Sequence, residues 1–364
     1  MPKNDQLFTY ITPRAILTGA AATEAITANW AWPLLGGTMA YGAMDVRTQE
    51  SGVFTRLGAI VRAAYERDAR AIPAPIRASI AAQMTALAAG RATFAGLDLA
   101  QPVLMGVLNL TPDSFSDGGR YTDGETAIAH GVALAEEGAA IIDVGGESTR
   151  PGAAPVSEAE EIARVVPVVA GLSSRGIKVS IDTRNAVVMR EALAAGAAIV
   201  NDITALTGDA CALETVAQAG SPVILMHMQG EPATMQDNPT YVWAPGEIYD
   251  YLAARILACV AAGIAKDRIA VDPGIGFGKS DTHNAEVMDH LAMFHSLGCP
   301  LALGASRKGF IGRMSRGEKA ADRLPGSLAA ALHAVGQGAQ IIRVHDVAAT
   351  RQALSIANRL NVAN

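Results

Sequence analysis

The sequence predicts an α/β protein whose main part is a closed (β/α)8 TIM barrel, preceded by an N-terminal segment of different character. From residue 103 onward, Ala- and Glu-rich helical stretches alternate with short apolar runs rich in Val and Ile. A glycine stands at each passage from a helical stretch back to an apolar run, and seven passages connect eight strands. The roughly 260 residues involved fit a barrel better than a doubly wound open sheet, which is the alternative.

The glycines that mark these passages share one position, just after a predicted helix, where a left-handed backbone conformation ends the helix. They are Gly138, Gly176, Gly196, Gly220, Gly263, Gly298 and Gly338.

The first predicted barrel strand is the apolar run 103–108, which leads into NLTPDSFSDGG at 109–119. A short, uncharged run of this kind is typical of a strand buried on both faces, and the polar segment after it is typical of a loop. Loops at the carboxyl ends of parallel strands carry the chemistry in α/β folds. We therefore expect a mobile loop here that contacts a polar ligand.

Residues 1–100 are predicted to form an N-terminal extension of unknown role, and residues 101–364 the barrel domain. Within the extension, Gly52 to Ala71 and Pro75 to Leu97 resemble two Ala-rich amphipathic helices. Trp30 and Trp32 are expected to pack against the barrel domain. The extension contains no catalytic constellation.

Composition narrows the class of protein. Half of the 364 residues are hydrophobic, which suffices for a large core, and the formal charge of -6 disfavours general nucleic-acid binding. Cys211, Cys259 and Cys299 show no pairing pattern, so we expect buried thiols in a reducing compartment. We find neither a secretion signal nor an apolar stretch of the roughly 18 residues that a membrane span needs. A soluble, cytoplasmic protein without membrane association is expected.

Polar residues occupy nearly every predicted strand end, and in a barrel these ends converge on one mouth. In chain order they are Asn109, the loop 145–153, Asp182, Asn201 with Asp202, His227, Asp272, Ser306 with Arg307 and Lys308, and Arg343 with His345. Burying such groups costs several kcal/mol unless they are paired, so stability alone does not explain the pattern. The sequence therefore predicts a ligand site at the mouth.

Two sets of side chains follow from that list. Asp182, Asn201, Asp272 and Lys308 offer donors and acceptors suited to a flat heterocycle with amino, ring N–H and carbonyl edges. A second set contains an amide oxygen, which can bind a cation, and cationic side chains, which can bind a phosphate. Its members are Asn109, Arg150, Arg343 and His345.

Several candidates have simpler explanations. Asp202 and Asp346 are expected to be helix caps, and His227 a structural hydrogen-bonding group. His283, His290 and His295 are expected along an exposed helix, without the spacing of a zinc site. DPGIGFGKS at 272–280 nearly matches a phosphate-binding loop, but Pro273 stands where that pattern has glycine.

Eight strings in order resemble the dihydropteroate synthase family over residues 102–360. They are NLTPDSFSDGG, IDVGGESTRPGA, SIDT, VNDIT, LMHMQG, DPGIGFGK, SRKGFIG and RVHD. The resemblance implies condensation of 6-hydroxymethyl-7,8-dihydropterin diphosphate with para-aminobenzoate, which gives 7,8-dihydropteroate and pyrophosphate. It also implies a homodimer. The helices near 323–337 and 347–360 are candidates for its interface, with an ordinary barrel exterior as the alternative for these helices.

The resemblance assigns roles to residues that match the strings. Asn109, Asp182 and Lys308 are implied as catalytic residues, and Asn109 also as the ligand of a Mg2+ cofactor. The implied substrate-binding residues are Phe115, Asp117, Thr149, Arg150, Asp182, Asn201, Asp272, Phe277, Ser306, Lys308, Arg343 and His345.

Two points stay open. Gly309 stands where many relatives have Ser or a larger polar residue, which leaves the binding of aminobenzoate and of sulfonamides open. A pterin-binding methyltransferase and a non-catalytic pterin-binding paralogue are alternatives. SRKGFIG and the long first loop argue against the first alternative, and retention of Asn109, Arg343 and His345 argues against the second.

Overall fold

The predicted barrel is confirmed in the computed structural model, which describes residues 8–91, 93–110, 122–148 and 156–362. Eight parallel strands form one sheet in the order β12-β11-β10-β9-β8-β7-β14-β13. A parallel bridge between Val271 and Leu301 joins the two ends of the sheet, and Val271 N donates to Pro300 O at 2.9 Å. The barrel strands are β7 (Val103–Asn109), β8 (Ile141–Gly145), β9 (Val179–Asp182), β10 (Ile199–Asp202), β11 (Val223–Met226), β12 (Ile269–Asp272), β13 (Ala302–Gly304) and β14 (Ile341–Val344).

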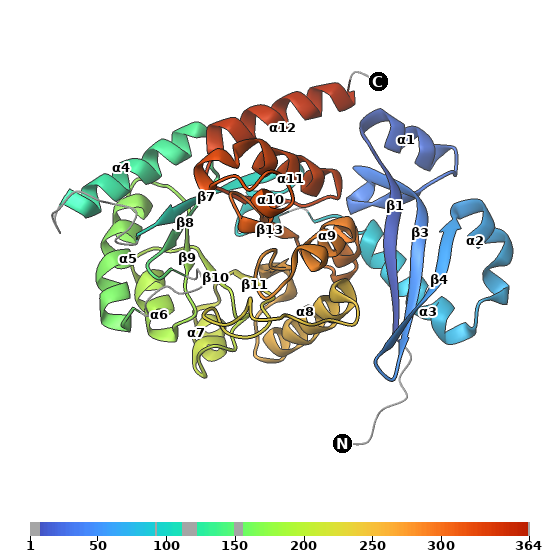
Figure 1. Ribbon diagram of the computed structural model, residues 1–364, viewed down its shortest axis with the longest axis horizontal. Helices are drawn as coiled ribbons and strands as arrows, with labels where there is room; N and C mark the ends of the chain where they lie inside the picture. The colour runs from blue at the N-terminus through green and yellow to red at the C-terminus, as the bar shows by residue number, and fades with distance from the viewer. Residues whose placement is uncertain (1–7, 92, 111–121, 149–155, 363–364) are drawn as a thin grey trace.

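Helices surround the sheet, as Figure 1 shows. They are α4 (Thr122–Glu137), α5 (Glu158–Ser173), α6 (Ala186–Ala194), α7 (Ala212–Ala219), α8 (Ala244–Ala261), α9 (Asp281–Asp289), α10 (Gly309–Arg313), α11 (Leu324–Gly336) and α12 (Val347–Val362), with 3-10 turns η4 (Lys266–Arg268), η5 (Leu291–Leu297) and η6 (Ala320–Asp322). All seven glycines predicted to end helices have positive φ, between 60° and 113°. Among the described residues, none of the helices combines the length and the apolar character needed to cross a bilayer.

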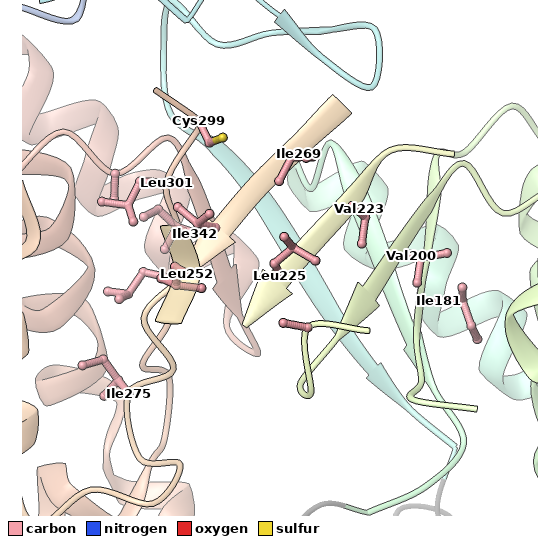
Figure 2. Close-up of a cluster of buried hydrophobic side chains, with 14 of the residues drawn as sticks. Ile181, Val200, Val223, Leu225, Leu252, Ile269, Ile275, Cys299, Leu301 and Ile342 are labelled. Atoms are coloured by element: carbon pink, nitrogen blue, oxygen red, sulfur yellow. The ribbon is translucent and has the colours of Figure 1, made fainter. Parts of the chain in front are cut away.

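Successive side chains of the barrel strands point alternately outward and inward, which gives two separate apolar regions. Side chains such as Val200 and Leu225 face outward and pack with helical residues such as Leu252 of α8 (Figure 2). Facing the barrel interior, residues near the strand starts, including Ile141 and Ile199, form a second cluster with Phe94. Phe94 lies in a short hairpin, β5 (Thr93–Phe94) and β6 (Leu97–Asp98), which covers the amino-terminal end of the barrel. The polar residues therefore lie above this cluster, toward the carboxyl end.

The N-terminal residues form an antiparallel sheet with its own core. Its strands are β1 (Phe8–Thr18), β2 (Trp32–Leu34), β3 (Met39–Glu50) and β4 (Val53–Val61), with β3 paired to each of the others. Its helical elements are α1 (Gly19–Thr27), η1 (Leu35–Gly37), α2 (Arg62–Asp68), η2 (Ala69–Ala71) and α3 (Ala74–Ala88). Ile80 and Leu87 of α3 are buried with Leu34 and Met44 of the sheet.

This sheet stands beside the barrel next to α8 and α9, and α1 lies near the end of α12 (Figure 1). The Tyr10 hydroxyl donates to Asp250 Oδ2 on α8 at 2.7 Å, and the Tyr10 ring lies 5.7 Å from that of Trp243. The ring of Phe54 on β4 also contacts Trp243, at a centroid distance of 5.3 Å. Apolar and polar contacts together therefore join the extension to the barrel.

The helix predicted at Gly52–Ala71 is wrong over most of its length, because residues 53–61 form β4 and only Arg62–Asp68 are α-helical. Pairing with β3 decides this segment, and long-range pairing overrides the helix propensity of its alanines. The helix predicted at Pro75–Leu97 is correct up to Ala88 and then gives way to β5.

The expected environments of several side chains are also wrong. Trp30 is 70% exposed, and Trp32 packs on Tyr41 within the extension rather than on the barrel. His290 and His295 are buried rather than exposed, because the extension covers this face. Arg14 Nη2 lies 3.1 Å from His290 Nε2, and Arg91 Nη2 donates to His295 O at 2.6 Å. Of the three cysteines, Cys211 is exposed and the other two are buried.

Candidate active site

Strand register places the predicted polar residues at one level around the carboxyl end of the barrel. Asn109 at the end of β7 pairs with Gly145, which pairs with Asp182, which pairs with Asn201. Because every second residue faces the same side of a strand, these residues share the inner face. Asp272 ends β12 two positions beyond Ala270, which is linked in register to Asn201 through Ile224, so it faces the same interior.

A buried ionic network connects the four strands β8, β9, β10 and β14. Arg343 on β14 donates through Nη2 to Asp182 Oδ2 at 2.7 Å and through Nε to Asp143 Oδ2 at 2.5 Å. Asn201 Nδ2 donates to the same Asp143 oxygen at 3.1 Å. Arg343, expected to act with His345 on a phosphate, therefore lies among the heterocycle-binding candidates.

Lys308 and Phe277 lie beside this network, since a Cβ placed on Gly304 would be 3.6 Å from Arg343 Cδ and 4.0 Å from Lys308 Nζ. Lys308 Nζ donates to the carbonyl oxygen of Ile275 and lies 4.4 Å from the centre of the Phe277 ring. Gly276, with φ of 82°, lets the lysine stem pass, since a Cβ there would be 3.1 Å from Lys308 Cδ. Asp272 Oδ1 accepts from Gly274 N at 2.7 Å, which fixes the carboxylate at the start of the same loop.

Ser306 and His345 form a third contact at the barrel mouth. Ser306 Oγ accepts from His345 N at 3.2 Å and lies 3.1 Å from His345 Nδ1. Ser306 is buried, and its contacts with His345 connect the loop after β13 with the loop after β14.

The charges of this site influence one another. Burial raises the pKa of Asp182 to about 7, against the lowering effect of Arg343, and Asp143 raises it further. Burial lowers the pKa of Lys308 to about 8, and the Asp272 carboxylate opposes that shift. Burial also lowers the pKa of Arg343, but Asp143 and Asp182 outweigh it, so the guanidinium stays charged. Perturbed groups concentrated in one place are typical of functional sites.

The structural role expected for His227 is confirmed, whereas Asp202 is not a helix cap, because the next helix begins only at Ala212. Both oxygens of Asp202 accept hydrogen bonds from its own loop, including Thr204 N at 2.7 Å and Leu206 N at 2.8 Å. His227 is buried and its Nδ1 lies 3.0 Å from Nζ of Lys279, which also donates to Phe277 O. Lys279 is fully buried, so the near match to a phosphate-binding loop has a structural role.

Four predicted residues, Phe115, Asp117, Thr149 and Arg150, lie outside the described residues. One residue of the site, Asp143, is not among the predicted strand-end residues, because it lies two positions before the end of β8. An Asp inside the apolar run IIDVG was the available signal, since an unpaired carboxylate is costly in a core.

Comparison with known proteins decides the family. A model of the family described as "Pterin binding enzyme" matches residues 105–345. Dihydropteroate synthase of Neisseria meningitidis serogroup B is 50% identical over 272 residues, which are 73% of this chain and 95% of the relative.

The chain belongs to the dihydropteroate synthase family. Its reaction condenses 6-hydroxymethyl-7,8-dihydropterin diphosphate with para-aminobenzoate to 7,8-dihydropteroate and pyrophosphate, in folate synthesis.

Solved structures agree. A Yersinia pestis dihydropteroate synthase in complex with a sulfonamide drug has a TM-score of 0.69 at 48% identity, covering 72% of this chain and 96% of that one. A Xanthomonas albilineans dihydropteroate synthase with 4-aminobenzoic acid has a TM-score of 0.69 at 47% identity, covering 72% and 94%. The family model begins at residue 105, so the N-terminal sheet lies outside it.

Proposed function

We propose that the pterin ring of the substrate binds between Asp182, Asn201, Asp272 and Lys308. The observation that carries this proposal is their convergence from three strands and the loop after β13, where Lys308 interacts electrostatically with Asp272 and Asp182. A carboxylate such as that of Asp272 can accept two parallel N–H bonds from the 2-amino and N3-H edge of a pterin. The Phe277 ring beside Lys308 adds an apolar surface for the heterocycle.

We propose that the diphosphate lies next to Asn109, Ser306 and His345. Arg343 uses Nε and one terminal nitrogen for its two carboxylates, and we assign the other terminal nitrogen to the substrate. The Arg343 guanidinium would then lie between the two carboxylates and the leaving diphosphate. Its orientation is fixed, because Asp182 and Asp143 both bind it.

The donor set fits Mg2+ bound jointly by the chain and the substrate. A Cβ placed on Gly145 would be 3.7 Å from Asn109 Oδ1 and 3.6 Å from Asp182 Oδ2, so two oxygens face this small space. Among the described residues, no three His, Cys, Asp or Glu side chains gather as a metal site. Mg2+ commonly takes one or two protein oxygens and completes its shell with phosphate oxygens and water. We propose Asn109 as its protein ligand, where the ion would neutralise charge on the diphosphate.

We propose that the reaction is driven by electrostatics. A dihydropterin can delocalise positive charge from its exocyclic methylene, so the carbon–oxygen bond can break before the arylamine attacks. The Asp182 carboxylate would stabilise that cation, while Arg343 and His345 would stabilise the leaving diphosphate. An arylamine attacks as the free amine, and the acidic arylammonium formed by the new C–N bond releases its proton to solvent water, so no strong general base is required.

For para-aminobenzoate we propose Ser306 and Lys308 as the residues near its carboxylate. Gly309 supplies no side chain there, and a Cβ on it would be 2.7 Å from Nη1 of Arg313. A larger residue at 309 would therefore require Arg313 to move. Sulfonamides that mimic the aminobenzoate are proposed to bind in the same place.

We also propose a cytoplasmic homodimer. Ile356 and Leu360 of α12 are 55% and 65% exposed, an apolar surface at one end of a helix. Multi-angle light scattering of the full chain should give twice the monomer mass. A monomer mass at a protein concentration of about 10 μM, which is near the Kd of a weak dimer, would contradict this proposal.

The test of function is pyrophosphate release in the presence of Mg2+. Release that requires both dihydropterin diphosphate and para-aminobenzoate, with dihydropteroate formed in equal amount, is expected. Pterin binding without release would indicate a non-catalytic binder. Methyl transfer to or from the pterin would indicate a different enzyme.

A further inference from the structure

Asp143 is the one charged residue of β8, and its carboxylate contacts two residues of the proposed pterin site. The residue is fully buried. Its register partners are Val107 on β7 and Ser180 on β9, below the level of Gly145 and Asp182. Asp143 is not among the residues proposed to contact the pterin, the diphosphate or the aminobenzoate.

The bond to Asn201 determines which end of the amide faces a ligand. A carboxylate can only accept hydrogen bonds, so Asn201 must turn its Nδ2 toward Asp143 Oδ2, at 3.1 Å. The amide oxygen is then the group left to accept an N–H of the heterocycle. Without Asp143, either end of the amide could face the ligand.

The bond to Arg343 fixes the guanidinium in its plane. Nε is held by Asp143 at 2.5 Å and Nη2 by Asp182 at 2.7 Å, so two carboxylates grip the planar group along its length. With Asp182 alone, the guanidinium could pivot about a single contact.

The same oxygen, Oδ2, accepts both bonds, whereas Oδ1 has no partner among the described residues. A carboxylate that served only stability would be expected to use both oxygens, because a buried unpaired oxygen is unfavourable. The geometry favours a carboxylate placed for the orientation of its two neighbours.

We propose that Asp143 is a positioning residue that orients the amide of Asn201 and the guanidinium of Arg343 for the pterin substrate. This inference rests on the proposed pterin site.

Two substitutions separate the hydrogen bonds from the charge. Asp143→Ala removes the acceptor, and we expect the Kd of dihydropterin diphosphate, measured by calorimetry without para-aminobenzoate, to rise about thirtyfold. Asp143→Asn keeps an acceptor oxygen where Oδ2 lies but removes the charge, so a smaller rise of about fivefold is expected. Equal Kd values for Asp143→Ala and wild type would overturn the proposal.

Combining Asp143→Ala with Asn201→Ala tests whether Asp143 acts through its neighbours. If it does, the loss of affinity in the double variant is smaller than the product of the two single losses, since Asn201→Ala already removes the part of the effect that acts through Asn201. Losses that multiply would overturn the proposal. If Asp143→Ala does not fold, the same cycle with Asp143→Asn gives the same two outcomes.

Glu161→Gln is the matched control. Glu161 is also a buried carboxylate with one oxygen lacking a partner among the described residues, but its other oxygen accepts from Asn185 Nδ2 at 2.7 Å, next to the start of α6, rather than from Asn201 or Arg343. We expect its Kd for the substrate to match wild type, and a loss equal to that of Asp143→Asn would contradict a specific role for Asp143. If Asn201→Ala binds like wild type, the proposed pterin site itself fails. If Asn201→Ala is weak and Asp143→Ala is normal, only the positioning role fails.

Discussion

Asp182→Asn isolates the electrostatic contribution of the residue at the end of β9. The change keeps the size of the side chain and an oxygen that can accept from Arg343 Nη2, now at 2.7 Å, so the barrel should still fold. It removes a charge from a side chain that is only 19% exposed, where water screens little of its effect. Loss of one preorganised electrostatic partner costs about 2.7 kcal/mol, which corresponds to a hundredfold in kcat.

The assay is steady-state pyrophosphate release at pH 7.5, between the pKa values of about 7 for Asp182 and about 8 for Lys308. Asp202→Asn is the control, because Asp202 is a buried strand-end carboxylate whose two oxygens accept hydrogen bonds from its own loop. We expect it to lower stability while its folded fraction turns over within threefold of wild type. A kcat for Asp182→Asn within threefold of wild type would refute the electrostatic role.

Three further predictions concern pH, the metal and the N-terminal sheet. The ratio kcat/KM should fall below about pH 7 as Asp182 gains its proton and above about pH 8 as Lys308 loses its own, and a profile flat from pH 5 to 10 would contradict these assignments. Asn109→Ala should raise the Mg2+ concentration needed for half-maximal activity about tenfold, and an unchanged metal titration would exclude Asn109 as a ligand. Phe54→Ala removes a half-buried ring that contacts Trp243, so the free energy of unfolding in urea should fall by about 2 kcal/mol, and a change below about 0.5 kcal/mol would mean that this contact does not stabilise the chain.

The barrel could be predicted because its signals are local. Each glycine that ends a helix lies next to the apolar run that follows it, and positive φ at Gly138 and Gly263 reflects a requirement of the turn itself. The carboxyl ends of the strands converge by topology, which is why Asp182 and Asp272, 90 positions apart, could be assigned to one site.

Asp143 was missed for a related reason. Strand ends are readily recognised, but the inner face continues down the barrel, and the residue two positions earlier shares that face. Its partners Asn201 and Arg343 come from distant strands, so the contact itself cannot be seen in the local sequence.

The N-terminal errors arise from long-range packing. VFTRLGAIV at 53–61 contains β-branched and aromatic residues at both ends, but its alternation is weak, and pairing with β3 makes it a strand. His290 and His295 occupy a face that would be exposed in an isolated barrel, and Arg14 and Arg91 of the extension cover it. Docking between segments about 200 or more residues apart has no local signature.

The central claim is that residues from separate strands bind one pterin at the carboxyl end of the barrel, and Asp272→Asn tests it most directly. Asp272 is buried and held by Gly274 N, so the amide should fit with little change in melting temperature. Calorimetry should show a rise of at least tenfold in the Kd of dihydropterin diphosphate, because an amide cannot accept two parallel N–H bonds. An unchanged Kd in a folded variant would mean that the pterin binds elsewhere.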